Sequence, residues 1–212
     1  MSVTTIILAV TTYVSISAFG DSSTLLPSRL RHGEWFDKLM FDAYKVAHGR
    51  QYYRMFSVGL LHSGWDHLIF NMLTLYFFGY YVEEAMGAIA NMGGSMTFLL
   101  FYVSALAVSS IPDLMKHKDN PCYTAVGASG AISAVLFAAI LLNPNMGIMF
   151  FFIPVPIKGY IFGIIYIAYS VYMAKKGTSN VAHSAHIAGA VYGFLFPLVL
   201  ESGLFGRFLE QI

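Results

Sequence analysis

Residues 125–134 read Ala-Val-Gly-Ala-Ser-Gly-Ala-Ile-Ser-Ala and lie inside a stretch, Asn120 to Ile157, that contains no Asp, Glu, Lys or Arg. A charge-free stretch of this length is typical of chain buried in a membrane. It also carries a Gly-x-Ser-Gly pattern around Ser129, which is compatible with a nucleophile. Small residues are common where membrane helices pack closely, so this pattern alone favours packing over catalysis.

A second polar element shifts that balance toward catalysis. His183-Ser-Ala-His186-Ile-Ala-Gly189 lies in another charge-free run, from Gly177 to Leu200. Ionisable side chains inside membrane segments are costly, and they usually face the bundle interior at functional sites. The two elements together therefore indicate a polar site within an apolar chain.

The composition indicates the compartment. The chain is 57% hydrophobic and 11% charged, with a mean hydropathy of +0.64. Soluble domains carry about 25% charged residues, so we expect an integral membrane protein surrounded by a lipid bilayer. The net charge is +1 and the Lys and Arg residues are scattered, which predicts no nucleic-acid partner.

Apolar stretches predict six membrane helices, at about residues 2–20, 66–86, 92–111, 127–142, 150–174 and 183–202. A span needs about 20 apolar residues. The longest charge-free stretch is divided because Asn143-Pro144-Asn145 interrupts it, and Pro154 and Pro156 precede the fifth apolar run. We therefore expect an all-α, six-transmembrane-helix bundle that forms a single membrane domain over residues 1–212.

The long first loop, residues 21–65, differs from the rest because it holds six Lys or Arg and four Asp or Glu. Apolar residues recur at helical spacing from Trp35 to Ala47, which predicts a helix lying in the membrane interface. A loop packed on the bundle is the alternative. Tyr52-Tyr53-Arg54 closes the loop, and aromatics beside an Arg are typical of headgroup anchoring.

The second expected helix opens with His62, His67 and Asn71. His67 and Asn71 are four residues apart, so they share one helix face. As polar groups in an apolar helix they must face the bundle interior, where they either bond neighbouring helices or donate hydrogen bonds at one point, as an oxyanion hole requires. For His62, at the boundary, we favour a structural hydrogen bond.

Ser129 and His186 are candidates for a nucleophile and its base. The chain between Asp119 and Glu201 has no acidic residue to orient His186, so such a unit would be a dyad. Gly189 and Gly193 lie on the face of His186, and Gly130 begins a small-residue stripe after Ser129. Two smooth faces let helices approach closely, which would bring the base within reach of the nucleophile.

These motifs together resemble the rhomboid intramembrane serine proteases. The resemblance rests on His62-x4-His67-x3-Asn71, Gly127-x-Ser129-Gly130 and Ala185-His186-x2-Gly189-x3-Gly193, in that order along nearly the whole chain. It implies that Ser129 is the nucleophile and His186 the general base, and that His67, Asn71 and the Ser129 backbone N–H form the oxyanion hole. It also implies transmembrane protein substrates and no metal or cofactor, with His62, Gly127, Gly130, Gly189 and Gly193 in supporting positions.

Two further comparisons with the family bear on structure. Glu83 and Gly87 match a Glu-x3-Gly pattern at the end of the second helix. Position 133, one turn after the nucleophile, is frequently aromatic in rhomboids and supports the catalytic imidazole by stacking. Here it is Ser133, so the sequence does not say what orients His186. Ser133 itself lacks flanking glycines, which disfavours it as the nucleophile.

Two topology signals conflict. With six spans, the odd-numbered loops together carry ten Lys or Arg, whereas the opposite side keeps Lys158 and Arg207. Positive charge favours the cytoplasmic side, so this count places the odd loops inside. The family resemblance places the termini inside instead. We follow the resemblance and expect a multi-pass protein of a bacterial inner membrane.

Two other functional classes fit parts of the pattern. A membrane metalloprotein would use His62, His67, His183 and His186 as ligands and give Ser129 no role. A catalytically inactive rhomboid-like protein would bind transmembrane segments without cleaving them, but the candidate nucleophile and base are both present. A transporter is disfavoured because the apolar runs contain no carboxylate or Arg to couple ions.

Overall fold

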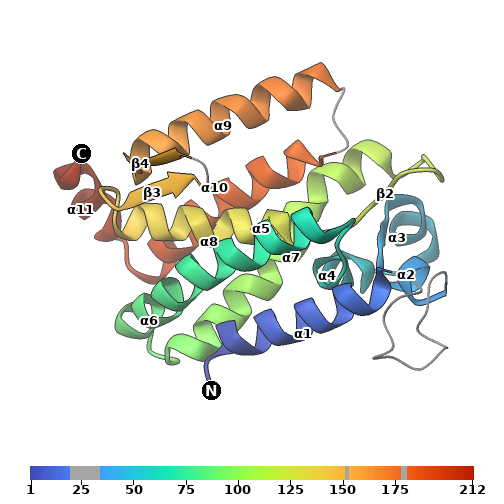
Figure 1. Ribbon diagram of the computed structural model, residues 1–212, viewed down its shortest axis with the longest axis horizontal. Helices are drawn as coiled ribbons and strands as arrows, with labels where there is room; N and C mark the ends of the chain where they lie inside the picture. Colours follow the sequence, from blue (N-terminus) through green and yellow to red (C-terminus); the bar gives the residue numbers. More distant parts are fainter. Residues whose placement is uncertain (20–33, 151–152, 178–180) are drawn as a thin grey trace.

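The computed structural model describes residues 1–19, 34–150, 153–177 and 181–212, and most of them are helical (Figure 1). The helices are α1 (Val3–Ala18), α2 (Glu34–Leu39), α3 (Ala43–Gly49), α4 (Arg54–Ser57), α5 (Trp65–Thr74), α6 (Tyr80–Ile89), α7 (Gly94–His117), α8 (Ser129–Leu142), α9 (Gly159–Lys176), α10 (His183–Leu200) and α11 (Leu204–Gln211). The 3-10 turn η2 (Val58–Leu60) precedes α5, and the π-helical turn η3 (Leu75–Gly79) joins α5 to α6. Two short antiparallel sheets pair β1 (Phe41–Asp42) with β2 (Thr124–Ala125), and β3 (Gly147–Phe150) with β4 (Ile153–Lys158).

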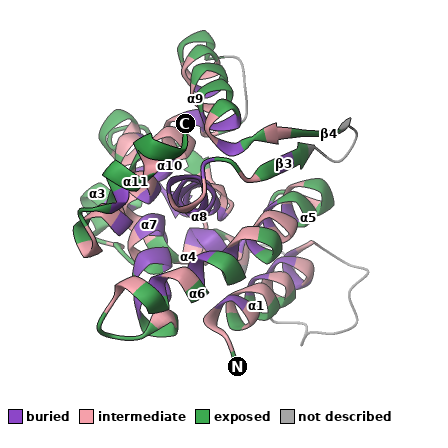
Figure 2. Ribbon diagram, turned by 90° about the vertical axis from the view of Figure 1, so that its left-hand side faces the viewer, coloured by how far each residue is buried: buried purple, intermediate pink, exposed green. Residues whose placement is uncertain are grey.

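Helix α8 lies at the centre of the molecule. It is apolar on all sides, and every residue from Gly130 to Leu141 is buried. Figure 2 shows this buried helix end-on, with α7, α10, α9 and α5 arranged around it. A helix that is hydrophobic all round belongs in a core, so the sequence of α8 explains its place. Its first residue, Ser129, is therefore held by the most enclosed element of the fold.

Two described helices, α7 and α10, are long and apolar enough to cross a membrane, and α1 and α8 are shorter apolar helices. The expected second helix is built from α5, η3 and α6 in succession. At Gly79, where η3 ends, a side chain would lie 2.9 Å from Thr4 of α1, so this glycine permits close contact with the first helix.

The expectation of a fifth helix over 150–174 is wrong at its N-terminal end. Residues 153–158 form β4 instead, and α9 begins only at Gly159. Strand β4 pairs with β3 through Gly147 opposite Lys158 and Ile148 opposite Ile157. Pro154 and Pro156 explain the correction, because proline lacks an N–H and disfavours helical backbone in the residue before it. The closing helix α11 was not predicted.

A single interfacial helix over 35–47 is also wrong. Strand β1 separates α2 from α3, and the Asp42 carboxylate caps α3 by accepting from the Lys45 N–H at 2.9 Å. Such a cap begins a new helix rather than continuing an old one. Phe41, Ala43 and Val46 are buried, and α3 packs on α7. The segment therefore consists of two short helices separated by a strand, and it shares with the alternative, a loop packed on the bundle, the contact with α7.

Arg54 is a structural residue rather than a headgroup anchor. Its side chain is buried, and its guanidinium donates to the carbonyls of Asp37 at 2.6 Å and Met40 at 2.8 Å and to the Gln51 side chain at 2.7 Å. Five donors in a fixed fork suit a role in holding several backbone carbonyls at once. Arg54 thereby ties α2 and α4 together within the first loop.

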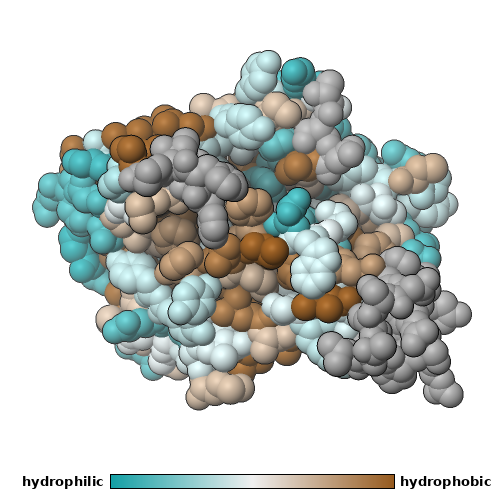
Figure 3. All heavy atoms as spheres, in the orientation of Figure 1, coloured by the Kyte–Doolittle hydropathy of each residue, from teal (hydrophilic) through white to brown (hydrophobic). Residues whose placement is uncertain are grey.

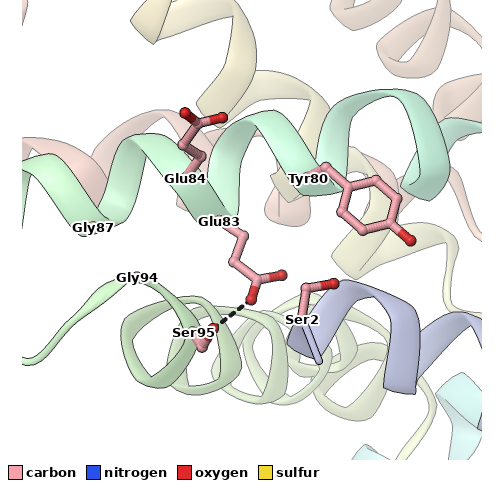
Figure 4. A pocket seen from close by; sticks show the side chains of 7 residues that line it. All are labelled: Ser2, Tyr80, Glu83, Glu84, Gly87, Gly94 and Ser95. Carbon is pink, nitrogen blue, oxygen red and sulfur yellow. Dashed lines mark hydrogen bonds between the residues drawn. The ribbon is translucent and has the colours of Figure 1, made fainter.

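Glu83 joins three helices at the opposite end of the molecule. Its carboxylate accepts from the N–H groups of Val3 and Thr4 at 2.9 Å each, from the Thr4 hydroxyl at 2.7 Å and from the Ser95 hydroxyl at 2.6 Å. Figure 4 shows Glu83 directed at Ser95, with Ser2 close by, while Glu84 points away. The charge sits at the N-terminus of α1, where a helix dipole favours an anion.

Candidate active site

Ser129 begins helix α8 after a tight turn. Gly127 has a φ of +122°, and its N–H donates to the Val58 carbonyl at 3.1 Å. The N-cap residue is Ala128, whose side chain makes no capping hydrogen bond. Because the first N–H groups of a helix have no partner within it, this terminus presents donors beside the Ser129 hydroxyl.

His186 reaches Ser129 from helix α10. Its Nε2 lies 2.7 Å from the Ser129 Oγ, a hydrogen-bond distance, and both side chains are half-buried. With the imidazole neutral, Nε2 can accept the hydroxyl proton while Nδ1 carries the ring hydrogen. The two residues are far apart in sequence, so the contact depends on how α8 and α10 pack.

Glycines allow that packing. A Cβ at Gly189 would lie 2.0 Å from the Gly130 carbonyl oxygen, and one at Gly193 would lie 2.0 Å from the Ala134 carbonyl oxygen. No side chain fits at such distances, so the backbones of α8 and α10 touch along this face. Gly130 has a second role toward α7, since a Cβ there would lie 2.4 Å from the Ser109 Oγ.

His67 lies against the turn that precedes Ser129. A Cβ at Gly127 would lie 2.5 Å from Cε1 and 2.8 Å from Nε2 of the His67 ring, so only glycine fits below this imidazole. The Ser63 Oγ lies 3.1 Å from the His67 Nδ1. If the Ser63 hydroxyl donates there, the ring proton resides on Nε2, the nitrogen nearer the turn.

Asn71 lies one helical turn after His67 on α5, which contacts α8. Its side chain is buried, and its Nδ2 has no hydrogen-bond partner within the part of the chain that the structure describes. A buried amide without an acceptor costs free energy, so its retention calls for an explanation. An acceptor that arrives with a substrate would supply one.

His62 holds the first loop against helix α1. It is fully buried, and its Nδ1–H donates to the Ser15 Oγ at 2.9 Å, because the single proton of that hydroxyl is donated to the Leu60 carbonyl. Its ring meets the edge of His67 with centroids 4.9 Å apart. Burial, with a smaller contribution from His67, lowers the pKa of His62 to about 3, so this imidazole is neutral at ordinary pH.

Two features of this region were missed by the sequence reasoning. Asp113 of α7 is buried and accepts hydrogen bonds from Tyr123 at 2.8 Å and from Ser184, two residues before His186. A small cavity extends from Asp113 and Ser110 to Ser129. Tyr166 of α9 contacts both Ser133 and His186. No local spacing links these residues, so the sequence offered no signal for them.

The four histidines that could serve as metal ligands contact one another in two pairs. His62 contacts His67, and His183 contacts His186 with ring centroids 5.8 Å apart. Across the described ranges, no group of three or more His, Cys, Asp or Glu side chains is placed to hold a metal ion.

Comparison with known proteins identifies the family. Residues 49–202 match the Rhomboid domain family, so the chain belongs to the rhomboid family of integral membrane proteins. It is 29% identical over 153 residues to RHOMBOID-like protein 12, mitochondrial, of Arabidopsis thaliana, which covers 68% of this chain and 45% of that protein. It is 33% identical over 165 residues to Rhomboid protease GluP of Bacillus subtilis, covering 76% and 29%.

A third relative is Rhomboid protein 1, mitochondrial, of Saccharomyces cerevisiae, 27% identical over 138 residues, covering 64% of this chain and 38% of the relative. The chain thus spans less than half the length of each of these three proteins. The relatives come from a bacterium and from mitochondria, so the family places this chain in a membrane without choosing which.

Proposed function

We propose that this chain is an intramembrane serine protease that cleaves peptide bonds in or near transmembrane segments, using Ser129 as nucleophile and His186 as base. The observation that carries the proposal is the 2.7 Å contact between the His186 Nε2 and the Ser129 Oγ at an uncapped helix N-terminus. A hydroxyl bonded to an imidazole beside free N–H donors is the arrangement that acyl transfer requires.

The proposal includes a single membrane domain over residues 1–212 with six transmembrane helices. Exposed apolar side chains support it: Phe77 is 63% exposed, Ile164 68% and Val199 86%, on three different elements. In Figure 3, apolar and weakly polar residues cover much of one face, and hydrophilic residues gather at the end where α11 lies. Apolar surface of this extent is stable when lipid covers it.

In the first step, His186 removes the proton from Ser129 as the Oγ attacks the carbonyl carbon of the scissile bond. The negative charge that develops on the carbonyl oxygen is stabilised by the Ser129 N–H, the His67 Nε2–H and the Asn71 amide. The imidazolium of His186 then gives its proton to the departing amine. The C–N bond breaks, and an ester between Ser129 and the substrate carbonyl remains.

In the second step, a water molecule replaces the amine. His186 takes a proton from this water as its oxygen attacks the ester carbonyl, and the same donors hold the oxyanion. Collapse of the intermediate returns the proton to the Ser129 Oγ and releases a carboxylic acid. No metal and no cofactor take part in either step.

A serine-directed fluorophosphonate probe tests the proposal. Incubation with the purified protein in detergent should give a covalent adduct on Ser129, mapped by mass spectrometry, and the protein should cleave a model transmembrane substrate. Absence of both from folded protein would favour a non-catalytic relative that binds transmembrane segments. An adduct on Ser133 in place of Ser129 would show that Ser129 is not the nucleophile.

A further inference from the structure

An aromatic ring from helix α9 stacks on the proposed base. The ring centroids of Tyr166 and His186 are 6.3 Å apart with an interplanar angle of 25°, a stacked arrangement. Aromatic rings attract at separations of 4.5 to 7 Å, roughly the distance found here. His183 meets the same imidazole edge-on from within α10, at an interplanar angle of 76°. The imidazole is therefore bounded by rings on two sides.

The Tyr166 hydroxyl is bound by Ser133. The Ser133 Oγ lies 2.6 Å from this hydroxyl and donates its proton to the Ser129 carbonyl at 2.8 Å. A serine hydroxyl has one proton, so the Tyr166 hydroxyl must be the donor toward Ser133. A chain of hydrogen bonds therefore runs from the ring that stacks against the proposed base to the backbone of the proposed nucleophile. Ser133 is buried, which strengthens these bonds.

Two further aromatic rings pack against Tyr166. It contacts Phe137 of α8, with centroids 5.6 Å apart, and Phe162 one turn earlier on α9, at 6.0 Å. Helix α9 lies at the edge of the bundle beside α10 (Figures 1 and 2). The contact with His186 therefore comes from a peripheral helix, whereas Ser133 belongs to the central one.

We propose that Tyr166 is a positioning residue that holds the His186 imidazole toward Ser129, and that Ser133 sets the position of the Tyr166 ring. This inference rests on the proposed function. The ring packs beside the imidazole in a roughly parallel orientation and limits its rotation, so that Nε2 stays directed at the hydroxyl. A rotated imidazole would break the 2.7 Å contact on which proton transfer depends.

The test measures fluorophosphonate labelling of Ser129, with the maximal rate (kinact) and the probe's half-saturating concentration (KI) determined separately. Tyr166→Ala should lower kinact by about 10- to 100-fold, the range expected for misplacing a catalytic group, and leave KI within about twofold. Tyr166→Phe keeps the ring but loses the bond to Ser133, and Ser133→Ala loses the same bond, so each should lower kinact by a similar and smaller factor, about two- to fivefold. A wild-type kinact in both variants would remove Ser133 from the proposal.

A double variant tests the geometry directly. Because Ser133 and Tyr166 touch, an aromatic side chain at position 133 can occupy the volume vacated at position 166. Ser133→Tyr combined with Tyr166→Ala should therefore recover most of the lost kinact, to within about fivefold of wild type, which a role in stability alone would not produce. The matched control is Tyr172→Ala, an exposed tyrosine on the same helix, which should label like wild type.

The outcomes separate the two proposals. Absence of both a Ser129 adduct and substrate cleavage from folded wild-type protein refutes the proposed function and, with it, the role of Tyr166. A wild-type adduct together with an unchanged kinact in Tyr166→Ala overturns only the role of Tyr166. If Tyr166→Ala does not fold, Tyr166→Leu replaces it with the same expected loss, and a wild-type kinact in the Leu variant likewise overturns the role.

Discussion

The buried polar groups around Glu83 and those around the start of α8 differ in how fully they are paired. At Glu83, four donors converge on one carboxylate from α1 and α7. At the start of α8, the helix lacks a side-chain cap, and the Asn71 Nδ2 has no hydrogen-bond partner in the described chain.

This difference separates stability from reactivity. A buried carboxylate whose lone pairs are all used lowers the free energy of the fold and has no bonding capacity left for a substrate. Donors left unpaired destabilise the fold but can bind a charge that forms during a reaction. Mutations at the two clusters should therefore affect different measurements.

The largest expected effect is the loss of catalysis in Ser129→Ala and in His186→Ala. Each removes one partner of a single proton transfer, so each should abolish cleavage of a model transmembrane substrate, and the double variant should be no worse than either. The thermal unfolding midpoint in detergent should change little. Full cleavage by Ser129→Ala, with loss in Ser133→Ala, would move the nucleophile to Ser133.

Asn71→Ala should have the next largest effect. Its amide can act only as a donor toward the developing oxyanion, and removing one such donor costs on the order of 10²–10³ in turnover where no other group compensates. We expect a smaller loss in kcat, about 10- to 100-fold, because His67 and the Ser129 N–H remain and water can substitute. KM should change much less.

The control for Asn71 is Thr74→Ala on the same helix, whose hydroxyl bonds its own helix at the Phe70 carbonyl. This variant should keep wild-type kcat. A contrary result would be that Asn71→Ala lowers only the thermal unfolding midpoint and leaves kcat of the folded fraction intact. That result would show that Asn71 stabilises the contact between helices and is not part of the oxyanion hole.

The sequence predicts this fold best where apolar runs are long and uninterrupted. The expected helices 92–111 and 183–202 begin within a few residues of the observed starts of α7 and α10. The small residues of α8 and α10 indicate the close contact that the structure has. The prediction fails where local signals compete. Prolines turn 153–158 into a strand, and the Asp42 cap breaks the helix expected over 35–47.

The candidate site divides in the same way. Ser129 and His186 stand in motifs with glycines, and His67 stands in a His-x4-His-x3-Asn motif, so single segments reveal all three. The structure brings these residues to one turn. Tyr166 stands in a run of apolar residues without any motif. Its contact with His186 exists only because α9 packs beside α10, so tertiary structure alone reveals it.

Glu83→Gln should lower stability without lowering intrinsic activity. The amide replaces one acceptor oxygen by a donor that faces other donors, so buried groups at α1 or α7 lose their partners. We expect a loss of roughly 2 to 4 kcal/mol in the free energy of unfolding, in line with hydrogen bonds to a charged group. Thermal unfolding in detergent measures it. Glu84→Gln is the control, because Glu84 is exposed and points away (Figure 4).

The smallest expected effect is that of a chelator, which tests whether the polar groups near Ser129 are metal ligands. If the histidines near Ser129 served as metal ligands, His67 and His186 would hold an ion, and chelation would reduce activity. In the dyad mechanism, imidazole and hydroxyl exchange a proton directly, so prolonged treatment with EDTA should leave cleavage within error of the untreated protein. Elemental analysis should also find no stoichiometric zinc or iron. One result would replace the serine protease proposal by a metalloenzyme: a stoichiometric metal that is lost in His67→Ala and in His186→Ala and that restores activity when it is added back to the chelated wild type. Removing either ligand of a shared ion weakens its binding, whereas a base and an oxyanion donor hold no ion.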